Sequence, residues 1–242
     1  MAQSVIAERE PQHPSSGSFI RDIVFGANDG VVTAIGFIIG IASSVAHREV
    51  IVVAGVLEVV AGAASMALGN YLAVKSHREF YDQMERVEKW EMKHKPEVER
   101  DEIREIYTNM GFDKAQVEML TKKVTSDDDM WLDVMMREEL GLTLEEAGNP
   151  IMSGLIIGSF FLAGGMLVIA PFIFLSPLTS AMIASFVLGL LVLCGIAFVR
   201  WFLNKGSLSK KLVETVVIGV IAALVGYFAG IVLKLFGFNV TL

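Results

Sequence analysis

The sequence is poor in cysteine, and most of its length carries little charge. Cys194 is the single cysteine among 242 residues and lies within an apolar run, which excludes an internal disulfide. The amino-terminal segment lacks the basic stretch and apolar core of a secretory signal peptide. We therefore expect residues 1–18 to be a mobile tail and not a cleaved leader.

Apolar residues make up 53% of the chain, which is high for a soluble domain. They gather in five long runs, at 19–46, 50–74, 151–175, 178–202 and 212–236. Each run is long enough to cross about 30 Å of hydrocarbon as a helix. The sequence therefore predicts an all-α, polytopic membrane protein with five transmembrane helices.

Charge is concentrated between the second and third runs. Residues 75–150 hold 20 of the 27 acidic and 12 of the 20 basic residues, which gives this insert a net charge of −8. An acidic balance argues against nucleic acid as a partner and favours cations. We expect four regions: a tail at 1–18, membrane helices at 19–74, a hydrophilic domain at 75–150 and membrane helices at 151–242.

Lysine and arginine near the ends of the runs indicate the orientation. One side of the membrane collects Arg21, Lys75, Arg78, Arg200, Lys205, Lys210 and Lys211, and the other collects Arg48 and Lys234. The first side is the expected cytosol. The amino terminus and the insert are then cytosolic, and the carboxyl terminus lies across the membrane.

Asp29 interrupts the first apolar run and allows two interpretations. In one, Asn28-Asp29-Gly30 forms a loop that caps a short helix starting at Val31. In the other, the helix is capped earlier, at Ser16 or Ser18, and runs from Phe19 to Ala46, so that Asp29 lies about 15 Å along its axis. Ionisable residues inside spans usually face a partner or a water-filled path. The second interpretation, in which Asp29 is a functional residue, is favoured.

The second apolar run carries another carboxylate, Glu58, on one helical strip with Met66. Thr33, one turn after Asp29, adds a hydroxyl on the Asp29 face. Carboxylate oxygens together with a thioether suit a borderline transition metal better than Mg²⁺ or Ca²⁺. Glycines at four-residue spacing in the first run also predict a close partner helix.

In the insert, glutamates recur every three residues on helices before and after Pro96, and a third helix carries Met135, Met136 and Glu139. Three short helices with inward carboxylates resemble bundles that hold transition metals. The spacing alone offers as candidate ligands Glu85, Glu88, Glu91, Glu99, Glu102, Glu105, Met135, Met136, Glu138 and Glu139. The alternative is an ordinary solvated face, on which glutamates alternate with lysines and arginines.

Three motifs together resemble the vacuolar iron transporter family over nearly the whole chain after residue 18. They are "FGANDGVVT", "GAASMALGNYLAVKS" and "MMREELGL". The resemblance implies a homodimer, joined through the first span, that moves Fe²⁺ from the cytosol into the vacuole in exchange for H⁺. It also implies that Asp29 and Met66 line the pathway. In the insert it implies a metal-gathering set made of Glu88, Glu91, Glu99, Glu102, Met135, Met136 and Glu139, with weaker support for Glu85, Glu105 and Glu138. No permanently bound cofactor is expected.

The residues support antiport by a separate argument. A carboxylate in a low-dielectric environment binds a proton readily, and a bound cation expels that proton, so the two compete. The sequence leaves open a Mn²⁺, Zn²⁺ or Co²⁺ carrier of the same architecture. A membrane-anchored iron oxidase and a metal sensor or buffer are further alternatives.

Overall fold

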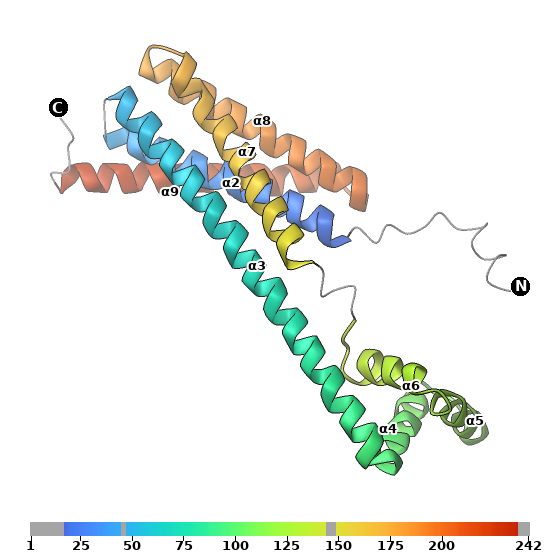
Figure 1. Ribbon diagram of the computed structural model, residues 1–242. Helices are drawn as coiled ribbons and strands as arrows, with labels where there is room; N and C mark the ends of the chain where they lie inside the picture. The colour runs from blue at the N-terminus through green and yellow to red at the C-terminus, as the bar shows by residue number, and fades with distance from the viewer. Residues whose placement is uncertain (1–16, 45–46, 144–148, 237–242) are drawn as a thin grey trace, which may run out of the picture. The chain divides into compact units, whose positions relative to one another are not determined.

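The computed structural model describes residues 17–44, 47–143 and 149–236, and these residues form helices and connecting turns without a β-strand. The helices, labelled as in Figure 1, are α2 (Gly17–Ser44), α3 (Arg48–His94), α4 (Pro96–Asn109), α5 (Lys114–Val124), α6 (Asp128–Val134), the π-helical turn η1 (Met135–Glu139), α7 (Pro150–Phe174), α8 (Leu178–Asn204) and α9 (Leu208–Leu235). The expected tail lies outside the described residues, except for its last two positions, which belong to α2.

The chain forms two compact units. The membrane unit comprises residues 1–71 and 151–242, and the insert unit comprises 72–150. Within the described residues, five helices, namely α2, α3, α7, α8 and α9, are long and apolar enough to cross a membrane. The predicted all-α fold with five spans is confirmed.

The helix α2 runs without a break through Asn28, Asp29 and Gly30. The interpretation of Asp29 as the cap of a helix starting at Val31 is therefore wrong. The helix begins at Gly17, two residues before the expected Phe19. An uninterrupted helix satisfies its backbone hydrogen bonds internally, as a segment surrounded by lipid requires.

Glycines let α2 pack closely against two other helices of the membrane unit. A Cβ atom at Gly30 would collide with the carbonyl oxygen of Phe161 in α7. At Gly40, a Cβ atom would lie 2.8 Å from the carbonyl oxygen of Gly226 in α9. The expected close partner helix is thus confirmed twice over, with α7 against the first glycine pair and α9 against the second.

The helix α3 is 47 residues long and belongs to both units. At 1.5 Å per residue it extends about 70 Å, more than twice the thickness of the hydrocarbon core. No proline interrupts it, and it ends one residue before Lys95-Pro96, where proline disfavours a helical residue ahead of it. We take its apolar part, residues 50–74, as the membrane-spanning segment.

The insert unit has a small core of its own, with Ile103, Trp131 and Met135 almost fully buried. The carboxylate spacing predicted helices at the end of α3, after Pro96 and around Met135, but not α5. That helix starts with a capping box, in which the Asp113 side chain accepts a hydrogen bond from the Gln116 backbone N–H and the Gln116 side chain accepts one from the Asp113 backbone N–H. The insert thus contains one more helix than expected.

Candidate metal-binding sites

Asp29 and Glu58 form the first candidate site, inside the membrane unit. Asp29 is half-buried near the middle of α2, and Glu58 is half-buried on α3. The two carboxylates lie close enough to repel one another. The Oε2 atom of Glu58 is buried without a hydrogen-bond partner. A divalent cation or a proton between these groups would relieve both the repulsion and the missing contact.

Glycine makes room beside Glu58. A Cβ atom at Gly62 would lie 2.7 Å from the ring of Phe161 and 3.7 Å from Oε1 of Glu58. The Phe161 ring of α7 therefore packs over the α3 backbone next to the carboxylate. Met66 lies further along α3 and is also half-buried.

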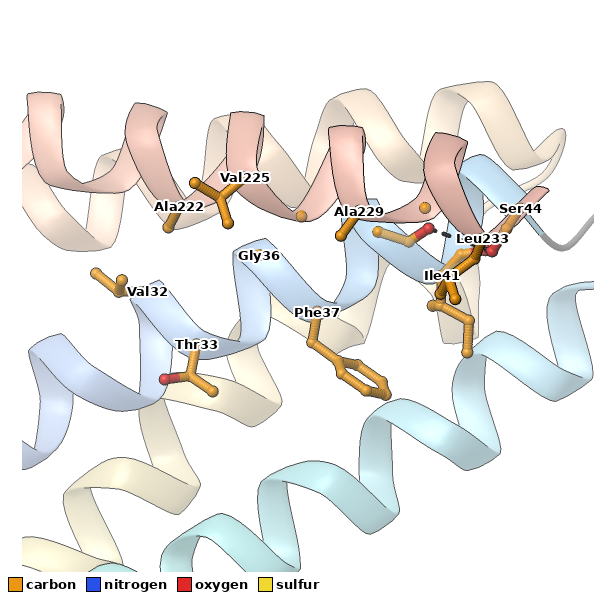
Figure 2. A pocket seen from close by; sticks show the side chains of 13 residues that line it. Val32, Thr33, Gly36, Phe37, Ile41, Ser44, Ala222, Val225, Ala229 and Leu233 are labelled. Atoms are coloured by element: carbon orange, nitrogen blue, oxygen red, sulfur yellow. Dashed lines mark hydrogen bonds between the residues drawn. The ribbon is translucent and has the colours of Figure 1, made fainter. Parts of the chain in front are cut away.

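Thr33, which is predicted to present a hydroxyl on the Asp29 face of α2, borders an apolar pocket. It belongs to the wall of a pocket of about 560 Å³ between α2 and α9, whose walls also include Gly36, Phe37 and Ser44 (Figure 2). Asp29 is not among the residues that line this pocket. Because the walls are mainly apolar, the pocket offers too few oxygen or sulfur atoms to hold a metal ion.

The second candidate site lies in the insert unit, where carboxylates from three helical segments come together. Glu88 and Glu91 are on α3, Glu99 and Glu102 on α4, and Glu139 on η1. Glu88 and Glu99 are only 5% and 2% exposed. In each of these two, the Oε2 atom is buried and has no hydrogen-bond partner.

Burial and mutual repulsion alter the titration of this cluster. Burial, followed by repulsion from Glu139, Glu91 and Glu102, raises the pKa of Glu88 to about 7. Burial, followed by repulsion from Glu102 and Glu88, raises the pKa of Glu99 to about 7 as well. The pKa of Glu139 is raised in the same direction, first by desolvation and then by its carboxylate neighbours. Part of the cluster is therefore protonated near neutral pH.

The structure distinguishes this cluster from the three glutamates with weaker support. Glu85 accepts a 2.7 Å hydrogen bond from Lys89, and Glu138 accepts a 3.0 Å bond from Arg137. Glu105 is exposed on α4. These surroundings are those of an ordinary solvated helix face. Glu91 is intermediate, since it accepts a 2.9 Å bond from Lys95 and still contributes to the repulsion on Glu88.

Met135 and Met136 are buried in the insert unit, with exposures of 0% and 2%. Met135 packs in the apolar core beside Ile103 and Trp131. Both methionines and Glu139 lie in the π-helical turn η1, where Leu140 donates a 3.2 Å bond to the Met135 carbonyl. Single π-turns inside α-helices occur frequently at functional sites.

The carboxylate cluster is open in this structure. Among the described residues, no three histidine, cysteine, aspartate or glutamate side chains are arranged closely enough to hold a metal ion. A cation of the cluster would have to draw the glutamates together.

Glu91 and His94 form a Glu-x-x-His sequence, the spacing found in di-iron carboxylate bundles. The His94 ring instead stacks on Trp90, with ring centroids 4.5 Å apart, and its Nδ1 atom lies 2.8 Å from the Trp90 carbonyl oxygen. The imidazole is exposed and engaged with its own helix.

Asp22 belongs to a polar network that the sequence analysis did not identify. It is 2% exposed on α2, accepts hydrogen bonds from Arg21 at 3.1 and 3.2 Å, and accepts one from the Ser153 hydroxyl of α7. Ser153 in turn accepts a 2.7 Å bond from Asn70 of α3. A usable signal was the seven-residue spacing of Asp22 and Asp29, which places both on one face of α2.

Comparison with known proteins identifies the family. The model of the VIT family matches residues 20–231. The chain is 31% identical to vacuolar iron transporter 1 of Oryza sativa subsp. japonica over 216 residues, which cover 89% of this chain and 86% of that one. It is 28% identical to vacuolar iron transporter 1 of Eucalyptus grandis over 221 residues, 91% of this chain and 89% of the other. This protein therefore belongs to the VIT family.

Proposed function

We propose that this protein moves Fe²⁺ from the cytosol into the vacuole in exchange for protons. The observation that carries the proposal is the pairing of Asp29 and Glu58 on two neighbouring membrane helices, with one Glu58 oxygen buried and unpaired. Two like charges inside a span are costly unless a cation or a proton joins them. The choice of iron as the metal and of the vacuole as the compartment is supported by the names of the relatives, which are vacuolar iron transporters.

Exchange follows from competition at these two carboxylates. On the cytosolic side, near neutral pH, Fe²⁺ displaces the proton that the pair holds. When the site faces an acidic lumen, protons reoccupy the carboxylates and release the metal. Met66 offers a thioether further along α3, which suits Fe²⁺ better than the hard cations Mg²⁺ and Ca²⁺.

The glutamate cluster of the insert unit gathers metal for the pathway. Its unpaired carboxylate oxygens and mutual repulsion give a cation a favourable place to bind. Because Glu88 and Glu99 titrate near pH 7, metal binding there weakens as the pH falls below neutrality. Met135 and Met136 would add thioether ligands, and Glu139 a carboxylate.

The assembly and location belong to the same proposal. The protein is a multi-pass protein of the vacuolar membrane, with its amino terminus and insert in the cytosol, as the distribution of Lys and Arg indicates. It acts as a homodimer that pairs through α2. The described glycines of α2 contact α7 and α9 of the same chain, so a second copy would have to use another face of this helix.

Carriers of Mn²⁺, Zn²⁺ or Co²⁺ have the same ligand requirements, and uptake competition between these ions and Fe²⁺ measures the preference. An iron oxidase would consume O₂ when Fe²⁺ is added to the purified protein. The Glu-x-x-His sequence gives it little support, because His94 is stacked on Trp90. A sensor or buffer would bind metal without accumulating it behind a membrane.

The test is Fe²⁺ uptake into sealed proteoliposomes with and without an imposed pH gradient. Antiport predicts that uptake is fast when the interior is acidic and slow when the pH is equal on both sides. It also predicts that the interior pH rises as iron enters. A rate of Fe²⁺ uptake that is the same with and without the pH gradient contradicts antiport. Binding of Fe²⁺ without uptake into the vesicles contradicts transport.

A further inference from the structure

A buried hydrogen-bond network ties together three helices of the membrane unit. Asp22 of α2 accepts from the Ser153 hydroxyl of α7, and that hydroxyl accepts from the Asn70 amide of α3. Since a serine hydroxyl carries one hydrogen, donation to Asp22 leaves it only acceptor capacity, which Asn70 fills. Both oxygens of Asp22 and the hydroxyl of Ser153 therefore have defined partners.

The position of Asp22 requires an explanation beyond helix packing. Its carboxylate is 3% exposed, whereas the arginine that neutralises it is 64% exposed. A buried charge pair is seldom more stabilising than a well-packed apolar contact of the same volume. Glycines already bring α2 against α7 at Gly26 and Gly30, so the fold does not need a charge here to bring the helices together.

The network occupies a particular place along the chain. Asn70 lies just before the boundary where α3 passes from the membrane unit into the insert unit, and Ser153 lies just after the boundary where the chain returns. On α2, Asp22 precedes Asp29 by seven residues, about 10 Å along the same face. The three residues thus join the helix that carries Asp29 to both segments through which the chain enters and leaves the insert unit.

We propose that Asp22 is a positioning residue for transport, which acts through Ser153 to hold α2, and hence Asp29, at a fixed height against α3 and α7. The proposal rests on the proposed transport function.

The experiment compares variants of the full-length protein in proteoliposomes that carry a pH gradient. Ser153→Ala removes the hydroxyl, and Asp22→Asn removes the charge. For each variant we expect the maximal rate of Fe²⁺ uptake to fall at least about fivefold, while the half-saturating Fe²⁺ concentration changes less than about twofold. Ser153→Thr, which retains a hydroxyl, should recover most of the rate.

Two controls separate positioning from general damage. Ser159→Ala removes an exposed hydroxyl from the same helix and should transport like the wild type. Because Asp22 and Ser153 act through one contact, the double variant should be no slower than the slower single variant within about twofold. If Asp22→Asn does not fold, the Ser153 variants alone decide the question.

A Ser153→Ala protein that matches the wild type overturns the inference and leaves the proposed function intact. Losses that multiply in the double variant overturn it too, as does a Ser153→Thr protein as slow as Ser153→Ala. A wild-type protein that moves no divalent metal overturns the proposed function together with this inference.

Discussion

At the scale of single residues, Asp29 and Glu58 form a pair of carboxylates whose repulsion a bound proton or cation can neutralise. Two carboxylates on adjacent membrane helices repel one another, and one oxygen of Glu58 has no partner. A proton on either group or a metal ion between them removes the repulsion. The proposed exchange requires that a proton and a metal ion can each occupy this pair in turn.

Asp29→Asn removes the negative charge and the titration while it nearly preserves the shape. We expect the variant to assemble but to lose pH-driven Fe²⁺ uptake, by about tenfold or more, since a cation in the site would keep only one carboxylate. Size-exclusion chromatography checks assembly, and proteoliposome uptake checks transport. Uptake at the wild-type rate would mean that Asp29 is not part of the pathway.

Met66→Leu keeps a similar volume and removes only the sulfur. Because the thioether favours borderline metals over hard ones, we expect a smaller loss of Fe²⁺ transport than in Asp29→Asn and a shift in preference toward Mn²⁺. Competition between Fe²⁺ and Mn²⁺ during uptake measures the ratio. An unchanged ratio would assign Met66 to packing alone.

The raised pKa of Glu99 predicts that the stability of the metal-free insert unit depends on pH. This pKa is about 7 in the folded protein and about 4.5 ordinarily, so between these values the folded state binds more protons than the unfolded state. The free energy of unfolding should therefore fall as the pH rises from about 4.5 to 7. In Glu99→Gln, the free energy of unfolding should fall less over this pH range. The variant should therefore unfold at a higher temperature than the wild type at pH 7.5, but not at pH 4.5.

Tryptophan fluorescence can follow this unfolding in metal-free protein, because Trp90 and Trp131 lie in the insert unit. Glu105→Gln is the matched control, since Glu105 is exposed on the same helix. If both variants show the pH dependence of the wild type, the raised pKa of Glu99 has no role in stability. Added Fe²⁺ under anaerobic conditions should stabilise Glu99→Gln less than the wild type.

At the scale of helices, the apolar runs and the four-residue glycine spacing were sufficient to predict the spans and the tight packing of α2. Both signals are local, because hydrophobic length and small residues are properties of one segment. The helix α5 was missed because its few apolar residues alternate with polar ones, and its stability comes from Asp113 capping and from packing.

The Asp22 network was missed for a different reason. Asp22 follows Arg21 at the end of a span, where charged residues are ordinary, and Ser153 and Asn70 are unremarkable in sequence. The spacing of Asp22 and Asp29 places both on one face of α2, but it does not reveal the contacts of Asp22 and Asn70 with Ser153, which join residues 131 and 83 positions apart. The place of Thr33 on the Asp29 face stays a prediction. The apolar pocket that Thr33 borders could not be predicted, because it depends on how α2 and α9 pack.

The contact between α2 and α9 depends on missing side chains. A Cβ atom at Gly226 would overlap the Gly36 carbonyl oxygen, so Gly226→Val should force the two helices apart. We expect a loss of roughly 1–3 kcal/mol in stability, seen as a lower unfolding temperature in detergent. Gly195→Ala is the control, because a Cβ atom at Gly195 of α8 would meet no atom within 4 Å. Equal unfolding temperatures for both variants would contradict this packing.

At the scale of the whole molecule, the number of crossings determines which regions share a compartment. Three helices that can span a membrane, α7, α8 and α9, separate the insert unit from the carboxyl-terminal end. If all three cross, these two regions lie on opposite sides of the membrane. The distribution of lysine and arginine at the span ends predicts that the insert is on the cytosolic side.

A membrane-impermeant maleimide can read this topology in sealed vacuoles, whose outer face is cytosolic. In a Cys194→Ala background, Glu105→Cys reports on the insert unit and Lys234→Cys on the end of α9. We expect label on the Glu105 variant in intact vacuoles, and on the Lys234 variant only after the membrane is opened. The Cys194→Ala protein without either addition gives the background. If both sites react in intact vacuoles, the chain crosses the membrane an even number of times between them, and one of α7, α8 and α9 is not a span.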